Sequence, residues 1–322
     1  MNSLFKSTFS ERMADFVSQK HALGYDYSSS ENYLQKFDQL CMALFPNETT
    51  LTRDICLAWA TKRENECVNT FRSRLPVVRE FARFLNRSGE AAYILPVDFA
   101  PKAKRHIPHI YTEEEIVRLW SVFDDIKPNS GNPVRQLVVP AVMRLLYCCG
   151  LRPCEARRLC VENVNLQNGS IEILESKGHK NRTVLMSDDL AVYMRAYDSR
   201  VNMVLPNREY FFPNSKGDLA SNKWLNRSFH SACNKAGIIK SGEYQPRVYD
   251  FRHTFATHRL YKWMNEGKDL TTKLAYLRAY MGHELLSATY YYIHLVPGMY
   301  EKMAGFDFGL FENLLPEVER DE

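Results

Sequence analysis

The stretch YDFRHTFATH at residues 249–258 decides how the rest of the chain is interpreted. Asp250 suits an N-cap, and Phe251 and Phe255 are spaced for an apolar contact one turn apart, so a helix is predicted to begin here. Arg252 would then lie in the first turn, close to free backbone N–H groups that favour an anion. An ordinary surface ion pair is the alternative role for such an arginine.

Two segments that precede this stretch carry cations in comparable places. The segment GLRPCE at 150–155 follows an apolar helix and begins another, which puts Arg152 at a helix N-terminus suited to a phosphate. Lys177 lies in the polar turn between two strand-like segments, 170–175 and 182–186. The alternatives are a solvent-facing arginine after a helix stop and an ordinary polar hairpin tip.

A glycine–histidine pair and a run of tyrosines follow the same stretch. The segment MGHE at 281–284 ends one helix, and Tyr290, Tyr291 and Tyr292 belong to the next. Neighbouring side chains on a helix point roughly 100° apart, so at most one of these tyrosines reaches a given site, and core packing is the alternative for each. The sequence lacks glycine-rich nucleotide loops, a G-x-S-x-G motif and a complete zinc-protease motif, which excludes common hydrolases and nucleotide-dependent enzymes.

The composition is that of an ordinary globular protein. The 322 residues are 45% hydrophobic and 25% charged, and 42 basic against 38 acidic residues give a net charge of +4. Eight cysteines show neither a C-x-x-C pair nor regular spacing, which favours reduced thiols over disulfides or a metal site. The N-terminus has no secretory pattern and the longest apolar region, 137–151, is too short for a bilayer, so a cytoplasmic protein is expected.

Two domains are expected, since roughly 150 residues per domain is typical. Helical periodicity predicts a helical domain at 1–100, and the stretch 101–108, rich in proline and lysine, is typical of a linker. A capping box that begins at Thr112 opens a mostly helical domain at 109–298 with one pair of strands. The predicted fold class is mainly α with a small antiparallel β-sheet. The apolar tail 299–322 has to be buried on its own domain or on a neighbouring protomer.

Charge is concentrated in one part of the first domain. Residues 62–87 hold seven basic and three acidic side chains, and this excess of four equals the net charge of the whole chain. DNA contact is one interpretation, and a solvated helix face is the other. Pro76 predicts that the helix in this segment begins late or is kinked.

The order of these pieces resembles the tyrosine recombinase, or phage integrase, family. The pieces are G-L-R-x-x-E, a hairpin lysine, D-F-R-H-T-F-A-T-H, a G-H pair, and a tyrosine nine residues after that histidine. No single piece is specific, whereas five in this order and spacing are. The resemblance covers about 107–297, and the first domain looks like the core-binding domain of that family. It implies a site-specific recombinase, an integrase or transposase, that cuts and rejoins DNA through a 3′-phosphotyrosine without ATP, metal or another cofactor.

The resemblance implies a role for each matching residue. Tyr292 matches the nucleophile, and Arg152 and Arg252 match two arginines that bind the non-bridging oxygens of the phosphate. Lys177 matches the general acid that protonates the departing 5′-oxygen. Glu155 matches the acid that supports the active-site arginine.

One more position matches the family, and one departs from it. His283 corresponds to a histidine that hydrogen-bonds the scissile phosphate. Where the family usually has a second histidine this chain has Tyr249, and a free phenol, with a pKa of about 10, is a poor general base at neutral pH. Either Tyr249 keeps a hydrogen-bonding role or proton transfer is slower and more pH-dependent, and we expect the first. His253 is expected to pack structurally.

Double-stranded DNA is the partner that the resemblance implies, and the reaction would take place at the bacterial nucleoid. A homotetramer on paired sites is implied as well, with the tail 299–322 docking on a neighbouring protomer. The alternatives are relaxation of DNA as in a type IB topoisomerase, and a catalytically weakened accessory protein that binds DNA, for which Tyr249 is the only hint. Two domains that clamp a duplex would turn these cations toward it: Arg72, Arg79, Arg83, Lys102, Lys104 and Arg105.

Overall fold

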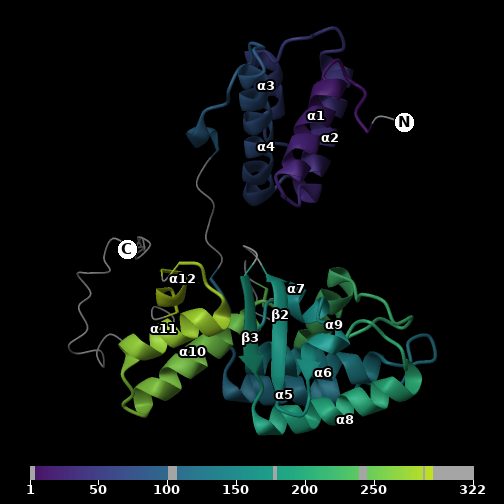
Figure 1. The fold of residues 1–322 in the computed structure, drawn as a ribbon, viewed down its shortest axis with the longest axis vertical. Helices are drawn as coiled ribbons and strands as arrows, with labels where there is room; N and C mark the ends of the chain where they lie inside the picture. Colours follow the sequence, from purple (N-terminus) through teal and green to yellow (C-terminus); the bar gives the residue numbers. More distant parts are fainter. Residues whose placement is uncertain (1–3, 101–106, 177–179, 239–244, 286, 293–322) are drawn as a thin grey trace. The chain divides into compact units, whose positions relative to one another are not determined.

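The computed structural model describes residues 4–100, 107–176, 180–238, 245–285 and 287–292. The chain forms two compact units, Met1–Arg105 and His106–Glu322 (Figure 1). Helices dominate both units, and the sheet found among the described residues has three antiparallel strands. The predicted fold class, mainly α with a small antiparallel sheet, is confirmed.

Four α-helices build the first unit: α1 (Ser10–Ala22), α2 (Ser28–Leu44), α3 (Arg53–Trp59) and α4 (Val68–Arg87). A short 3-10 helix, η1 (Val97–Phe99), follows them. Phe16, Phe37, Trp59 and Phe81 are buried where the helices meet, and α4 packs against both α1 and α2. The aromatic core explains why the helices predicted from apolar spacing fold together.

Helix α4 begins earlier than the sequence suggests. Its N-cap is Cys67, whose Sγ accepts a hydrogen bond from the backbone N–H of Thr70, and the helix runs on through Pro76. The predicted late start is therefore wrong. The proline is exposed, while its neighbours Val77 and Val78 are buried, so packing against the core holds the helix together despite the missing N–H.

The second unit combines the sheet with eight described α-helices, none of which is long and apolar enough to cross a membrane. The strands are β1 (Val164–Asn165), β2 (Ser170–Ser176) and β3 (Lys180–Leu185), and they pair in the order β1-β2-β3 after the 3-10 helix η2 (Val161–Asn163). The helices are α5 (Glu113–Asp124), α6 (Arg135–Cys149), α7 (Pro153–Arg157), α8 (Asp188–Val204), α9 (Asn222–Lys235), α10 (Asp250–Asn265), α11 (Leu270–Met281) and α12 (Ser287–Tyr290).

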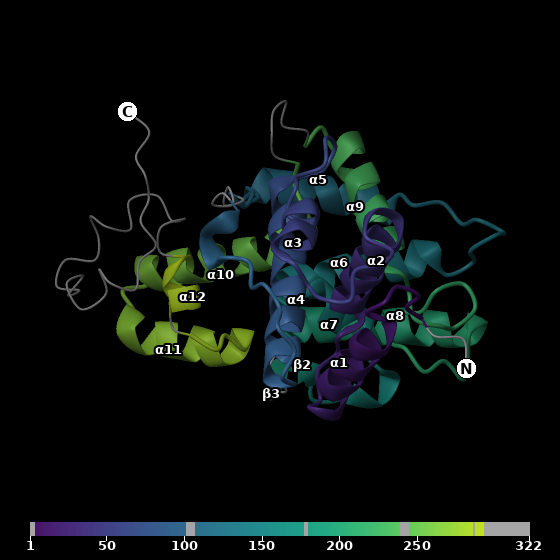
Figure 2. The same cartoon turned by 90° about the horizontal axis from the view of Figure 1, so that it is seen from above.

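Helix α6 lies at the centre of this unit, packed against α5, α8 and α10. In both views α10, α11 and α12 lie at one side of the unit and α8 and α9 at the other (Figures 1 and 2). The predicted capping box is present at the start of α5, where Thr112 Oγ1 accepts from the N–H of Glu115 at 3.2 Å. The predicted strand pair is present as well, with Ile171 opposite Val184 and both side chains buried.

The start of α10 differs from the sequence prediction in two respects. Asp250 is the first helical residue rather than the N-cap, and its wholly buried carboxylate accepts a hydrogen bond from the backbone N–H of Arg247 at 2.8 Å. Phe251 and Phe255 belong to separate hydrophobic clusters, so the expected contact between them is not made. Phe251 packs in the main core of the unit, and Phe255 stacks with Tyr280 of α11.

Two glycines, Gly150 and Gly282, end helices α6 and α11. Gly150 ends α6 at φ 60° and Gly282 ends α11 at φ 63°, a left-handed conformation that favours glycine. A Cβ added to Gly150 would lie 2.4 Å from a ring carbon of Phe255. The missing side chain therefore lets α10 pack directly over the end of α6.

The substitution Gly150→Ala is expected to lower the free energy of unfolding by about 2–4 kcal/mol, because left-handed strain and overpacking add together. Gly267→Ala is the matched control, since Gly267 has φ 66° and no atom within 4 Å of an added Cβ. It should lose only about 1 kcal/mol. Urea denaturation of the two variants measures the difference, and equal losses would contradict the role given to the contact with Phe255.

Candidate active site

Two arginines meet at the glycine-ended helix termini. Arg252 is wholly buried and donates from Nη1 to the carbonyl of Gly150 at 2.7 Å and from Nη2 to the carbonyl of Met281 at 2.6 Å. Its Nε is buried with no hydrogen-bond partner among the described residues. Arg152, the N-cap of α7, donates from Nη2 to the carbonyl of Gly282 at 3.0 Å. The sequence predicted both as phosphate ligands, and the fold brings them to the same place.

Tyr292 lies next to these arginines and is 3% exposed. Its ring centroid lies 5.8 Å from that of His283 and 5.5 Å from that of His253. Burial raises the pKa of Tyr292 to about 12, against the opposing positive charge of Arg252. Tyr291 is half-buried, so Tyr292 is the more deeply enclosed of these two tyrosines. The phenol is therefore protonated at neutral pH before a phosphate arrives.

His283 connects the end of α11 to the segment that carries the tyrosine. Its Nδ1 lies 2.8 Å from Oγ1 of Thr289, a wholly buried residue of α12. Burial, followed by the positive charges of Arg252 and Arg152, lowers the pKa of His283 to about 3. A neutral imidazole bonded at Nδ1 leaves Nε2 for another partner. Thr289 was missed in the sequence. Tyr290, Tyr291 and Tyr292 were also predicted to share one helix, whereas α12 ends at Tyr290 and Tyr292 lies in the turn that follows.

Glu155 is 8% exposed, and its carboxylate accepts hydrogen bonds from two arginines. Arg152 donates to it from Nη1 at 2.7 Å and from its backbone N–H at 2.9 Å, and Arg182 donates from both Nη atoms at 2.9 and 2.8 Å. Burial alone would raise the pKa of Glu155, but the hydrogen bonds and charges of these arginines lower it to about 2. The predicted contact between Glu155 and Arg152 is present, whereas Arg182 was missed.

Tyr249 stands at the rim of this group and is 38% exposed. Its ring lies 5.3 Å from that of His253, which in turn lies between Tyr249 and Tyr292. Burial works against the charged form of Arg152, yet the hydrogen bonds that Arg152 donates to Glu155, the charge of Glu155 and the nearby Tyr249 raise its pKa. Tyr249 therefore lies close enough to Arg152 to act on its charge, and the hydrogen-bonding role expected for Tyr249 stays a prediction.

Several predicted residues lie outside the described part of the chain. Lys177 falls between the described ends of β2 and β3, where Ser176 pairs with Lys180. The tail 299–322 and its docking on another protomer also fall outside. The same holds for the three linker cations Lys102, Lys104 and Arg105.

Comparison with known proteins gives the family. Residues 110–298, more than half of the chain, match the Phage integrase family. The chain belongs to the phage integrase family of tyrosine recombinases. It is 27% identical to the putative integrase/recombinase y4rB of Sinorhizobium fredii over 294 residues, which cover 89% of this chain and 93% of that protein. It is 30% identical to the tyrosine recombinase XerD of Rhizobium meliloti over 229 residues, or 69% of each chain.

Solved structures share the fold of this recombinase. A lambda integrase dimer bound to a COC′ core site has a TM-score of 0.62 at 13% identity and covers 88% of this chain and 94% of its own. The XerH recombinase bound to a palindromic difH substrate, in a post-cleavage complex, has a TM-score of 0.61 at 18% identity, with coverage of 85% and 77%. The family resemblance is confirmed, and the recombinase is a site-specific DNA strand transferase that acts through a tyrosine.

The basic part of the recombinase's first unit divides into exposed and buried arginines. Arg72 and Arg83 of α4 are exposed. Arg79 is only 8% exposed and donates to the carbonyls of Leu95 at 2.8 Å and Pro96 at 2.7 Å. The expectation that Arg79 faces DNA is corrected, because the chain after α4 folds back over it and uses its donors. Arg72 and Arg83 remain candidates for DNA contact.

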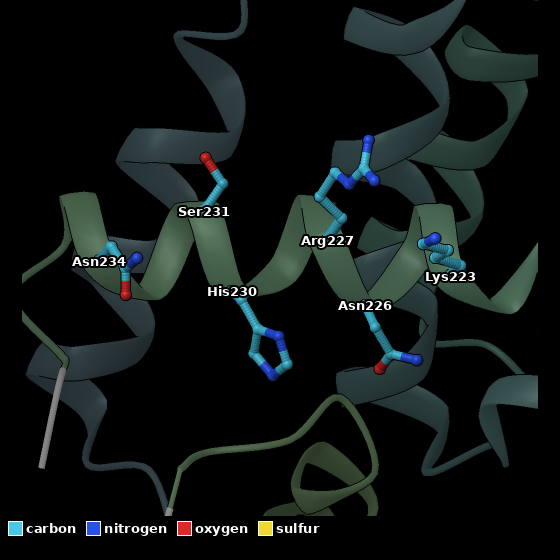
Figure 3. Close-up of a pocket in the computed structure, with 6 residues that line it drawn as sticks. All are labelled: Lys223, Asn226, Arg227, His230, Ser231 and Asn234. Atoms are coloured by element: carbon cyan, nitrogen blue, oxygen red, sulfur yellow. The ribbon is translucent and has the colours of Figure 1, made fainter.

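A second polar surface lies on α9 and was missed in the sequence. Figure 3 shows its side chains projecting from one stretch of the helix, around a surface hollow. Its basic, amide, imidazole and hydroxyl side chains recur at spacings of three and four, which keeps them near one another on a helix. Amide, imidazole and guanidinium groups are the side chains that read bases and bind phosphates. The residues that line the hollow are Lys223, Asn226, Arg227, His230, Ser231 and Asn234.

Proposed function

We propose that this recombinase is the integrase or transposase of a mobile element, which cuts and rejoins DNA at specific sites through a 3′-phosphotyrosine on Tyr292. The observation that carries the proposal is the enclosure of the Tyr292 phenol beside Arg252 and His283. The similarity to a putative integrase/recombinase, over 89% of this chain and 93% of that protein, supports the choice of reaction.

The proposed reaction begins at the phenol of Tyr292. Its oxygen attacks the phosphorus and gives up the phenol proton to water, the bond to the 5′-oxygen breaks, the departing oxygen takes a proton, and the phosphate stays on the tyrosine. Arg152 and Arg252 hold the non-bridging oxygens, where negative charge grows in the transition state. His283 acts as a neutral hydrogen-bond donor from Nε2, with Nδ1 occupied by Thr289. Because the covalent bond conserves the energy of the phosphodiester, rejoining needs neither ATP nor a metal.

Two residues complete the proposed proton chemistry. Lys177 is the general acid for the departing 5′-oxygen, as the family match implies. We propose that Tyr249 keeps the hydrogen-bonding role of the residue it replaces, since it lies close enough to Arg152 to help raise the pKa of that arginine. A rim position, 38% exposed, suits a group that meets the DNA backbone as it enters.

The proposed partner is a double-stranded recombination site, and the proposed assembly is a homotetramer on two paired sites. Each Tyr292 attacks one strand, so exchange between two duplexes needs four protomers. We assign residues 1–100 to a DNA-binding domain and the tail 299–322 to docking between protomers. Action on bacterial DNA places the recombinase at the nucleoid, in the cytoplasm.

The experiment that tests the function starts from a site selected by the full chain out of randomised duplexes. A selected site with a nick next to the scissile phosphate traps the intermediate, because the cut fragment diffuses away. We expect a denaturation-resistant adduct at a DNA 3′ end and a free 5′-hydroxyl. Relaxation of plasmids without the site would favour a topoisomerase, and site binding without adduct would favour an accessory protein.

Arg72 and Arg83 are proposed to contact phosphates, so the double variant R72Q/R83Q should weaken DNA binding and reduce its salt dependence. Two lost phosphate contacts predict a fall of about 2 in the slope of log affinity against log salt. The control pair K36Q/R53Q removes the same charge from exposed positions on α2 and α3. A slope that is equal in wild type and R72Q/R83Q would exclude these two residues from the DNA surface.

A further inference from the structure

Arg182 is the most completely bonded side chain near the active site that the proposed reaction does not use. It lies on β3, and its side chain is 9% exposed. Both Nη atoms donate to the carboxylate of Glu155, at 2.9 and 2.8 Å, and Nε donates to the carbonyl of Tyr280 at 2.9 Å. The planar fork therefore fixes both oxygens of Glu155 at once.

Three arginines share the last carbonyls of α11. Arg182 donates to the carbonyl of Tyr280, Arg252 to that of Met281, and Arg152 to that of Gly282. These carbonyls lie at the negative end of the helix, where cations are favoured. Arg182 bonds the first of these three consecutive carbonyls. The other two are bonded by Arg252 and Arg152, the proposed phosphate ligands. Helix α11 and strand β3 also pack against each other (Figure 1).

Arg182 also lies directly against the backbone that precedes His283. A Cβ added to Gly282 would lie 3.1 Å from Cδ and 3.2 Å from Nη1 of Arg182. The left-handed turn at Gly282 thus has the arginine packed on it, and the next residue is His283. Arg182 therefore contacts both the Glu155 carboxylate, which bonds Arg152, and the Gly282 turn, which precedes His283.

We infer that Arg182 is a positioning residue for strand cleavage, which acts through Glu155 to aim Arg152 and through the Gly282 turn to hold His283. The inference rests on the proposed function of those two residues. The guanidinium of Arg152 has two anchors, the Glu155 carboxylate at Nη1 and the Gly282 carbonyl at Nη2. Arg182 lies against both of them, so the position of the guanidinium depends on how firmly Arg182 holds the carboxylate and the Gly282 turn. Because Arg182 bonds both carboxylate oxygens of Glu155, the guanidinium of Arg152 stays in the position from which it binds a phosphate oxygen.

The variant Arg182→Lys tests the inference, because it keeps the charge and loses the fork. We expect single-turnover cleavage of the nicked duplex to slow by at least about tenfold, while the dissociation constant for DNA changes by less than about twofold. Arg144→Lys is the matched control: Arg144 is a half-buried, ion-paired arginine of the same unit that bonds Asp124 and Tyr193. Its cleavage rate should equal that of wild type.

Two further measurements separate positioning from a general loss of stability. In a double-mutant cycle with Glu155→Gln, the double variant should cleave no more slowly than the slower single variant, because both act through one contact. The imidazole of His283, which faces Arg152, Arg182, Arg252 and His253, should also titrate at higher pH in Arg182→Met, since one of its positive neighbours is gone.

The outcomes separate the inference from the function on which it rests. If the wild-type chain forms no adduct, the proposed function fails. If it forms the adduct and Arg182→Lys cleaves at the wild-type rate, or if the losses in the double-mutant cycle simply multiply, Arg182 is not a positioning residue and the function stands. Should Arg182→Lys be less stable, the cycle is measured at a temperature where all four proteins are folded, and the same criterion applies.

Discussion

Replacing Tyr292 by phenylalanine is expected to reduce the covalent adduct on the nicked duplex by about 10⁴-fold or more, to below detection. The substitution removes the single oxygen that forms the new bond to phosphorus and leaves a ring of nearly the same shape. Because Tyr292 is buried against His283 and His253, a phenylalanine fits the same space, and site binding should be unchanged. Gel analysis of denatured reaction mixtures measures the adduct.

The neighbouring tyrosines provide the controls for that experiment. Tyr291→Phe and Tyr290→Phe should each form the adduct at a rate close to that of wild type. Tyr291 is half-buried, and its ring centroid lies 6.0 Å from that of Tyr292. An adduct that survives in Tyr292→Phe but disappears in one of the other two variants would transfer the nucleophile to that tyrosine.

Arg252→Lys is expected to slow cleavage by about 10²–10³-fold with little loss of DNA binding. The lysine keeps the positive charge, but one ammonium group cannot bond the carbonyls of Gly150 and Met281 and still reach a phosphate oxygen. The charge that builds up in the transition state thus loses a positioned donor. Single-turnover rates on the nicked duplex, with the dissociation constant measured in parallel, give the two effects separately.

Arg259→Lys is the control for that substitution. Arg259 lies seven residues further along α10, half-buried over the ring of Phe255, and has no place in the proposed reaction. We expect normal cleavage from it. If Arg252→Lys instead lowered DNA affinity and the cleavage rate of bound DNA stayed at the wild-type value, Arg252 would serve binding alone.

The family resemblance, carried by the order and spacing of five short motifs, predicted four residues that meet at the site. Arg152, Arg252, His283 and Tyr292 are up to 140 residues apart in the sequence, yet the fold brings them together. Local signals also predicted the capping box at Thr112 and the pairing of the two long strands. These features depend on short-range periodicity and capping, which a sequence displays directly.

What the sequence did not reveal depends on long-range pairing. Arg182 bonds a residue 27 positions away and another 98 positions away, and no periodicity connects them. Arg79 shares a helix face with Arg72 and Arg83, and only the return of the chain at Leu95 sets it apart. Strand β1, with two residues, is too short to show alternation.

The hydrogen bond between His283 and Thr289 affects which protomer supplies the tyrosine that cuts a given strand. It holds the segment of Tyr292 beside His283, two residues after the Met281 carbonyl that accepts from Arg252 of the same chain. A tyrosine lent to a neighbour would have to break that buried bond and leave its ring's place beside His283 empty. In the proposed tetramer we therefore expect one damaged copy to leave its own strand uncut, with no neighbour able to cut that strand for it.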